Sequence, residues 1–270
     1  MLEYYKSCPL CGSDSRLLVS ADCSRHPLWH EPLPSTLEWM RCEHCGHVYT
    51  RHYWTEAGLA EVFRNVHDSQ IIKASDNFDA RRSTWTPVVE RAIDLLGGYR
   101  PVMNAADPPT WVDVGCGNGA LMMAAGDFGF SAIGVDARTK TADQLKNLGF
   151  NAIAGSFADI VINGRADVLS MMDLLEHLPY PKEALAKAAD VVRPGGLIVI
   201  SLPDLTCSTW RLMDRLRTNP YWGELEHHHN FGRMKLLQLL RDSGFEPAAV
   251  TMPNRYKAQL EVYAVRAPAR

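Results

Sequence analysis

The sequence WVDVGCGNGALM, residues 111–122, joins a short apolar run to three closely spaced glycines and then to a second apolar segment. The first run has the length and composition of a buried strand, and the second indicates a helix. Gly115, Gly117 and Gly119 let the backbone pass close beneath a ligand, and the N-terminus of the following helix adds partial positive charge. This stretch therefore predicts a strand, a glycine turn and a helix that together bind a nucleotide-like ligand.

Short apolar runs alternate with helical patterns from residue 111 onward. SAIGVD, NAIAGS, ADVLSMMD and LIVISLP read as strands, and helical spacing separates them. Strands alternating with helices predict a parallel, doubly wound α/β sheet. The last two runs, PAAVTM and LEVYAVR, are joined only by PNRYKAQ, which is too short for a helical crossover, so the last strand is expected to run antiparallel. We therefore expect a Rossmann-like, seven-stranded sheet.

Two CxxCG motifs stand near the N-terminus, where the chain is rich in cysteine, proline and tryptophan. One contains Cys8 and Cys11, and the other contains Cys42 and Cys45. Each motif presents two thiolates on a tight turn, and four thiolates complete a tetrahedral site with no open position. The pattern predicts a small zinc-ribbon-like module in which Zn²⁺ is structural.

The chain divides into three parts on this interpretation. Residues 1–55 form the zinc-binding module, residues 56–110 a helical linker or cap, and residues 111–270 the nucleotide-binding domain. The middle part has an apolar stripe at helical spacing, which ends at Gly97 and Gly98. The sequence leaves open whether this part caps the site or builds a homodimer.

Composition narrows the class of protein. The formal net charge is −3, so no overall positive field attracts nucleic acid. No apolar run approaches the roughly 20 residues that cross a bilayer, which predicts no membrane segment. The first residues lack a basic region followed by an apolar run, and seven cysteines without a secretion signal are typical of a reducing compartment. We expect a cytoplasmic protein.

An acidic residue ends the strand that follows the glycine turn. Asp136 lies 19 residues after Gly117, where a carboxylate can accept hydrogen bonds from both hydroxyls of a ribose. The GxGxG spacing, with Asp113 inside the preceding strand, resembles motif I of class I S-adenosylmethionine-dependent methyltransferases. The resemblance implies that S-adenosyl-L-methionine binds at Asp113, Gly115, Cys116, Gly117, Gly119, Asp136 and Ala137.

The resemblance continues through residue 270. The segment DLLEHLPYPKEALAKAADVVRPGGLIVISLPD is similar to the acidic-His segment, with Asp173, and to the PGG turn of these enzymes. The N-terminal motifs resemble a subgroup common in bacterial sugar and natural-product pathways. One departure is at the third strand, where the family often has an acid for the adenine amine and this chain has Ser156 and Phe157. We expect Phe157 to flank or stack on adenine, with Ser156 beside it.

Three consecutive histidines, His227 to His229, precede the helical pattern that begins near Arg233. Because the carboxyl ends of parallel strands share one edge, everything between Pro203 and Arg233 should lie above that edge. Methyl transfer to a hydroxyl requires loss of its proton, and imidazole titrates near neutral pH. Extended residues alternate faces, so His227 and His229 are expected to point the same way and one of them to serve as general base. His177 is the rival base, and packing or polar lid contacts are the alternative.

Arg211 and Arg215 lie four residues apart in a segment with the pattern of a lid helix. They should share a helix face and could hold an anionic substrate such as a nucleotide diphosphate. The competing interpretation is an ordinary solvated face.

These features favour a methyltransferase whose acceptor is a sugar, a nucleotide-linked sugar or a natural-product intermediate. Oxygen is the preferred acceptor atom because a histidine base is available, while carbon and nitrogen stay open. One alternative is an RNA methyltransferase with an N-terminal zinc module, which the slightly acidic charge disfavours. Another is a non-catalytic cofactor-binding protein, against which the intact glycines and Asp136 argue.

Overall fold

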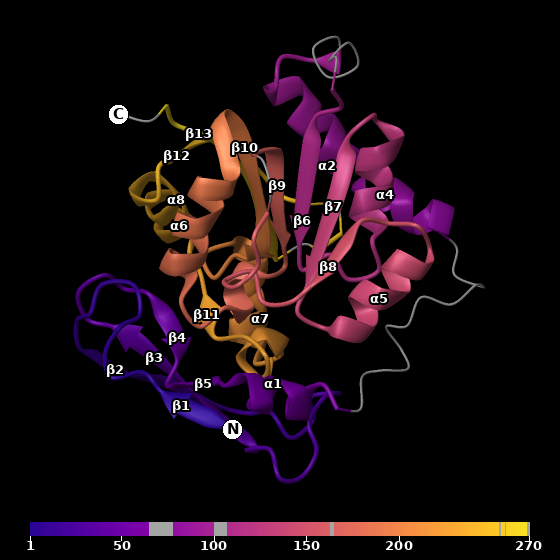
Figure 1. The fold of residues 1–270 in the computed structure, drawn as a ribbon. Coiled ribbons are helices and arrows are strands. Elements are labelled where there is room, and N and C mark those ends of the chain that lie inside the picture. The colour runs from indigo at the N-terminus through magenta and orange to yellow at the C-terminus, as the bar shows by residue number, and fades with distance from the viewer. Residues whose placement is uncertain (65–77, 100–106, 163–164, 254, 257, 269–270) are drawn as a thin grey trace.

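The computed structural model describes residues 1–64, 78–99, 107–162, 165–253, 255–256 and 258–268. Its centre is a seven-stranded sheet in the order β12-β13-β10-β9-β6-β7-β8 (Figure 1). The strands are β6 (Thr110–Val114), β7 (Ser131–Asp136), β8 (Ala152–Ala154), β9 (Ala166–Met172), β10 (Val192–Pro203), β12 (Phe245–Thr251) and β13 (Gln259–Arg266). Neighbours from β8 to β10 pair in parallel, and β13 is antiparallel to both β10 and β12. This confirms the predicted fold class, including the antiparallel last strand.

Helices cover both faces of this sheet, because its strands alternate apolar residues to each side. Trp111 packs on one face with α2 (Phe78–Leu95) and α4 (Ala120–Asp127). Val112 and Val114 pack on the other face with α6 (Pro181–Val191) and α8 (Arg233–Asp242). On the side of α4, α5 (Thr139–Asn147) packs against β7 and β8. The period-two alternation of β6 thus buries both faces, as expected of a doubly wound sheet.

The N-terminal residues form two small sheets of their own. β1 (Leu2–Tyr4) pairs with β5 (His52–Trp54), and β2 (Ser15–Asp22), β3 (Thr36–Cys42) and β4 (Val48–Thr50) are consecutive in a four-stranded sheet. The fourth strand of that sheet, β11 (His229–Asn230), comes from the other end of the chain and pairs antiparallel with β4. Figure 1 shows the N-terminal strands below the large sheet, near α7 and β11.

The segment between β10 and α8 connects the two parts. It contains α7 (Ser208–Leu216), the single-turn helix η2 (Pro220–Trp222) and β11. Another single turn, η1 (Leu175–His177), follows β9. In the middle part, α1 (Glu56–Val62) and α2 are helical as predicted, while residues 65–77 and 100–106 lie outside the described residues. No described helix is long and apolar enough to cross a membrane.

Two buried indoles anchor the N-terminal strands to this connecting segment. The Nε1 of Trp39 donates to the carbonyl of Trp222 at 2.8 Å, and the Nε1 of Trp54 donates to the carbonyl of Leu225 at 2.8 Å. Both rings are at most 2% exposed. A buried N–H donor stabilises the fold only when its acceptor is in place. These two hydrogen bonds therefore hold residues 222–225 against the N-terminal strands.

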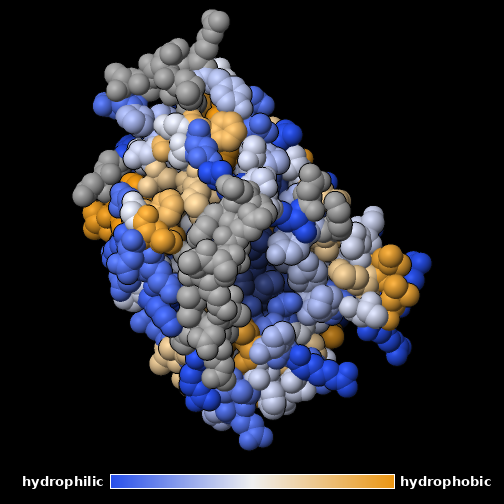
Figure 2. Space-filling view, turned by 90° about the vertical axis from the view of Figure 1, so that its right-hand side faces the viewer, coloured by the Kyte–Doolittle hydropathy of each residue, from blue (hydrophilic) through white to orange (hydrophobic). Residues whose placement is uncertain are grey.

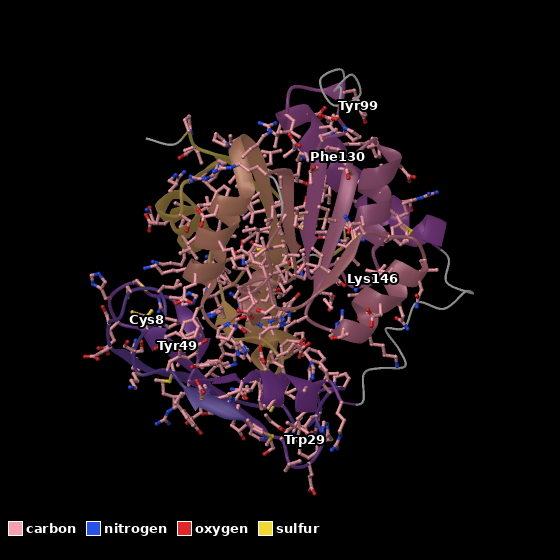
Figure 3. The ribbon with its side chains drawn as sticks, viewed as in Figure 1. Cys8, Trp29, Tyr49, Tyr99, Phe130 and Lys146 are labelled. Atoms are coloured by element: carbon pink, nitrogen blue, oxygen red, sulfur yellow. The ribbon has the colours of Figure 1, made fainter. Side chains whose placement is uncertain are left out.

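We predict that replacing Trp39 by Phe lowers the free energy of unfolding by about 2–4 kcal/mol, since a buried carbonyl loses its donor and a void opens. Trp29, labelled in Figure 3, offers a matched control: its Nε1 donates to Pro34, within the N-terminal part, and its ring is only half-buried. Trp29→Phe should lower the free energy of unfolding by a smaller amount. Urea unfolding checks this, and equal losses for the two variants would contradict the anchoring role.

Candidate functional site

The glycine turn after β6 forms a cradle at the carboxyl edge of the sheet. Gly115, Gly117 and Gly119 have φ values of 76°, 51° and 75°, a left-handed conformation that disfavours side chains. A Cβ at Gly119 would lie 2.6 Å from the side chain of Leu145, whereas a Cβ at Gly117 would meet, among the described residues, only the Gly115 carbonyl, at 3.9 Å. The backbone at Gly117 is therefore open to a ligand. Figure 2 shows the face that lies on the right in Figure 1, with a hollow surrounded mainly by hydrophilic residues.

Asp136 ends β7 beside this turn, as predicted. Its carboxylate accepts a hydrogen bond from the Gly117 backbone N–H at 3.0 Å. The guanidinium of Arg138 donates to both oxygens, from Nε at 2.9 Å and from Nη2 at 3.0 Å. Asp136 thus has the expected position, but an arginine that the sequence interpretation did not consider already binds it. Only the two-residue spacing from Asp136 to Arg138 could have indicated this pair.

Asp113 is buried within β6 and contacts the neighbouring strand. Its Oδ1 accepts from the Ser170 hydroxyl at 2.6 Å, and the same hydroxyl accepts from the Trp111 Nε1 at 2.8 Å. Burial and, to a smaller extent, the charge of Asp136 raise the pKa of Asp113 to about 7, against the lowering effect of the Ser170 hydrogen bond. Asp113 therefore links β6 to β9 beneath the turn. Cys116, also predicted here, is buried, and its backbone N–H donates to Val135 at 3.1 Å.

The other residues predicted to bind the donor, Ala137, Ser156 and Phe157, lie after β7 and β8. Ala137 is exposed at the carboxyl edge. The Ser156 hydroxyl accepts from the backbone of Ala158 at 3.3 Å. The ring of Phe157 is 6% exposed and belongs to the core, with the Lys187 Nζ 5.5 Å from its centroid.

Asp173 follows β9 at the same sheet edge in a left-handed conformation, with φ of 53°. Its carboxylate accepts from the Ser201 hydroxyl at 2.7 Å, and its backbone N–H donates to the Ser201 carbonyl at 2.9 Å. Burial raises its pKa. A strained non-glycine residue held by two hydrogen bonds at a strand end is a common feature of functional edges.

Three side chains converge next to Asp173: Glu176, His177 and His227. One polar atom of each lies within 4.8 Å of the others, and the rings of His177 and His227 are 4.6 Å apart in an edge-to-face arrangement. The His177 Nδ1 donates to the carbonyl of Glu226 at 3.1 Å, which leaves its Nε2 as a proton acceptor. The structure therefore brings together two of the three predicted base candidates.

His229, the third candidate, points elsewhere. Its Nδ1 lies 3.0 Å from the Nε2 of His47, and its Nε2 lies 3.0 Å from the carbonyl of Leu178. Since that carbonyl only accepts, His229 Nε2 carries the proton and its Nδ1 accepts from His47. Both nitrogens of His229 are thus hydrogen-bonded at the contact with the N-terminal strands.

The expectation that His227 and His229 share a face was wrong. Strand β11 begins only at His229, and residues 225–226 form a turn in which the His227 N–H donates to Glu224 at 3.3 Å. Strand alternation therefore does not extend back to His227. His228 is buried between them, with its backbone N–H bonded to Glu176 at 2.8 Å.

Burial keeps these imidazoles neutral. It lowers the pKa of His177 to about 4 and that of His229 to about 4, and it lowers the pKa of His227 and of His228 well below the usual value for histidine. The neighbouring His177 lowers the pKa of His227 further. Burial has the opposite effect on Glu176, whose pKa it raises well above the usual range. At neutral pH the two imidazoles can therefore accept a proton.

A second polar cluster, which the sequence did not indicate, lies beside the first. The His26 Nε2 is 2.9 Å from a carboxylate oxygen of Glu224 and 3.6 Å from one of Glu226. These carboxylates raise the pKa of His26 against the lowering effect of burial. The N-terminal module thus contributes a side chain to the loop that carries His227. No local spacing could have revealed a contact across 198 positions.

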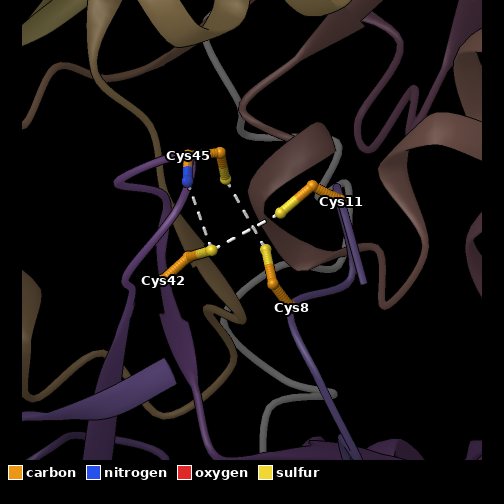
Figure 4. A group of neighbouring side chains, drawn as sticks. All are labelled: Cys8, Cys11, Cys42 and Cys45. Atoms are coloured by element: carbon orange, nitrogen blue, oxygen red, sulfur yellow. Dashed lines mark hydrogen bonds between the residues drawn. The ribbon is translucent and has the colours of Figure 1, made fainter. Parts of the chain in front are cut away.

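The four predicted metal ligands converge in the N-terminal module (Figure 4). The sulfur atoms of Cys8 and Cys45 are 3.7 Å apart, and those of Cys11 and Cys42 are 3.4 Å apart. Tetrahedral Zn²⁺ with Zn–S bonds of about 2.3 Å requires sulfur separations of about 3.8 Å. The four thiols therefore fit one tetrahedral ion, and Gly12 and Gly46 follow them in left-handed turns.

Comparison with known proteins identifies the class to which this fold and site belong. The family model described as a methyltransferase domain matches residues 81–250, more than half of the chain, and the chain belongs to this family. The resemblance to class I S-adenosylmethionine-dependent methyltransferases is confirmed at the level of family and fold.

Named relatives agree with this class. The chain is 30% identical over 98 residues to the ubiquinone biosynthesis O-methyltransferase of Colwellia psychrerythraea and 32% identical over 99 residues to that of Cupriavidus pinatubonensis, each match covering 33% of this chain. These matches span only 40% and 39% of the two relatives.

Solved structures share the fold at low identity. Magnesium protoporphyrin IX methyltransferase from Synechocystis PCC 6803, solved with S-adenosylhomocysteine, superposes with a TM-score of 0.57 at 15% identity, over 79% of this chain and 100% of that one. The mitomycin 7-O-methyltransferase MmcR superposes with a TM-score of 0.54 at 18% identity, over 78% of this chain and 58% of that one.

Proposed function

We propose that this protein transfers a methyl group from S-adenosylmethionine to a hydroxyl of a small-molecule acceptor: a sugar, a nucleotide-linked sugar or a natural-product intermediate. The observation that carries the proposal is the open backbone at Gly117 beside the Asp136 carboxylate, at the carboxyl edge of a methyltransferase-family sheet. The named O-methyltransferase relatives support oxygen as the acceptor atom.

The donor would lie across the carboxyl edge. Its ribose hydroxyls would donate to Asp136, and its amino-acid end would lie over the turn from Gly115 to Gly119. Asp113 and Cys116 would support that turn from below, since both are buried. When bound, the donor supplies an electrophilic methyl on a sulfonium.

Two further contacts complete the proposed donor site. Adenine would lie against the backbone at Ala137, Ser156 and Phe157, because the Phe157 ring is packed in the core. Asp173 follows β9 at the sheet edge next to the histidine pair, and in this proposal it would lie between donor and acceptor.

Asp136→Ala should weaken binding of S-adenosylhomocysteine by about 10-fold or more, because the ribose loses its acceptor. Gly117→Ala should also weaken binding, since its methyl would project into the open space. Isothermal titration calorimetry measures both. Thr139→Ala, at an exposed position of α5 near Arg138, is the control with unchanged affinity. Wild-type affinity in Asp136→Ala would remove the ribose assignment.

Proton removal is the remaining task, and the pair of His177 and His227 is placed for it. As the acceptor oxygen bonds to the methyl carbon, the carbon–sulfur bond breaks and the hydroxyl proton passes to a neutral imidazole of the pair. The Nδ1–H of His177 donates to the Glu226 carbonyl, so in the neutral ring the lone pair that can accept a proton is on Nε2. His229 is left out of this role because both of its nitrogens are already bonded.

We expect His177→Gln or His227→Gln to lower kcat by about 10²–10⁴-fold for whichever imidazole accepts the proton, with little change in donor affinity. His229→Gln is the matched control within the triplet. Because the pKa of His177 is lowered to about 4, the imidazole stays neutral on acidification, so kcat/KM should hold from pH 8 to 6 and fall only below about pH 5.

Two results would contradict this role. One is a near wild-type rate in both variants. The other is loss of activity on mild chelation at unchanged zinc content, with recovery on adding a divalent cation, which would make these side chains metal ligands instead.

We further propose that Cys8, Cys11, Cys42 and Cys45 hold a structural Zn²⁺. The support is the fit of their sulfur separations to one tetrahedral ion. All four coordination positions would be filled by thiolates, so the ion would stabilise the N-terminal strands and take no part in methyl transfer.

Elemental analysis of purified protein should find about one zinc per chain, and the double variant Cys8→Ser, Cys42→Ser should lose it because two of four ligands are gone. Cys23→Ser is the control: Cys23 is equally buried in the same module, but its thiol contacts the Pro34 carbonyl. Zinc retained in the double variant, or absent from fresh wild-type protein, would refute this site.

A further inference from the structure

A large groove separates the N-terminal module from the helices that follow β10. Its volume is about 1530 Å³, and β2, the end of β3 and the turn before β4 form one wall. The other wall is α7, η2 and the first turn of α8. The groove begins at Asp204, the residue directly after β10, and it does not include the glycine turn or the pair of His177 and His227.

Basic side chains predominate in this groove. Five of them line it: Arg41, Arg211, Arg217, Arg233 and Lys235. Among the described residues, only Arg233 forms an ion pair, at 3.4 Å from the carboxylate of Asp204. Arg41 comes from the N-terminal wall and the other three unpaired cations come from the helical wall; no carboxylate in the described part of the chain forms an ion pair with any of these four. Such an arrangement favours an anionic ligand.

The two acidic residues that line the groove are already engaged. Asp204 is 1% exposed and accepts from the backbone N–H of Thr206 at 2.9 Å as well as from Arg233. The Oδ1 of Asp214 accepts from Asn219 and from the Trp222 indole, both at 2.7 Å. The Asp204 carboxylate is therefore bonded within the protein, as is one oxygen of Asp214, and the basic side chains that line the groove outnumber these two acids.

Two helices begin at the groove. The first residues of α7, Ser208 and Thr209, line it, as do Arg233 to Lys235 at the start of α8. The N-cap of α8 is Gly232, which makes no side-chain cap, and no acidic residue occupies the first turn. The Arg233 N–H donates to the Thr206 hydroxyl at a long 3.4 Å, and the N-terminus of the helix still carries partial positive charge that attracts phosphate and other anions.

An unsatisfied amide lies on the same surface. Asn230, in β11, lines the groove and is 1% exposed, and neither polar atom of its carboxamide has a hydrogen-bond partner among the described residues. A buried amide without a partner costs free energy, which a ligand that hydrogen-bonds to it would recover. The unpaired carboxamide of Asn230 therefore indicates a ligand independently of the basic side chains.

We propose that this groove binds a small molecule through a diphosphate group, as in a nucleoside diphosphate or a conjugate of one. The unpaired cations on the two walls would offset the negative charge of a diphosphate, and backbone N–H groups at the start of α8 could donate to its oxygens. A nucleic acid is the less suitable occupant. Binding its backbone requires many cations that contact successive phosphates, whereas this chain has a net charge of −3. The proposal concerns binding alone and stands whether or not methyl transfer occurs.

Titration with inorganic diphosphate, uridine diphosphate and uridine tests this site. We expect both diphosphates to bind and uridine not to bind, with a change in the fluorescence of Trp222, which lines the groove. The double variant Arg211→Ala, Lys235→Ala should weaken binding by about 10-fold or more. Arg215→Ala is the matched control, because Arg215 lies on the same helix but does not line the groove.

Three outcomes would overturn the proposal: no diphosphate binding at millimolar concentration, an equal effect of Arg215→Ala and the double variant, or tighter binding of a single-stranded RNA than of either diphosphate. Circular dichroism of each variant verifies folding. Binding of S-adenosylhomocysteine, measured on the same samples, separates failure of this site from failure of the proposed donor site.

Discussion

The pairing of β11 with β4 is the constraint on which the functional surface depends. Residues 229–230 complete a sheet whose other strands lie within the first 50 residues, and the indoles of Trp39 and Trp54 secure the segment just before them. This contact holds the N-terminal module over the carboxyl edge of the large sheet. Both the histidine cluster and the basic groove lie beside this contact, so neither would have its form without the module.

Desolvation by this contact explains the electrostatics of the histidines. His227, His228 and His229 are buried and His177 is half-buried; burial lowers the pKa of all four, and neighbouring imidazoles lower the pKa of His227 and of His228 further. Neutral imidazole can both donate and accept, so His47 donates to His229 while His177 donates from Nδ1 to a carbonyl and carries its lone pair on Nε2. The same burial keeps His177 and His227 neutral at neutral pH, which is the state that the proposed role as proton acceptor requires.

Local sequence patterns predicted the large sheet, the glycine turn, the position of Asp136 and the four cysteines, because each depends on spacing within a short segment. They did not predict where His227 and His229 point, because a turn precedes β11 and strand alternation does not reach His227. The bond from His47 to His229 spans 182 positions, and that from Trp111 to Ser170 spans 59. Contacts at such separations follow from tertiary packing, which spacing along the chain does not reveal.

Asp136 shows how a correctly predicted residue can still have an unexpected partner. Its two oxygens accept four hydrogen bonds, one from Gly117 and three from Arg138. A carboxylate offers about four acceptor positions, so these bonds already satisfy it. A ribose can bind there only if Arg138 gives up part of its contact. The net free energy of ribose binding is then the difference between the hydrogen bonds formed with the ribose and those lost from Arg138. Donor affinity in this chain therefore depends on Arg138 as well as on the carboxylate.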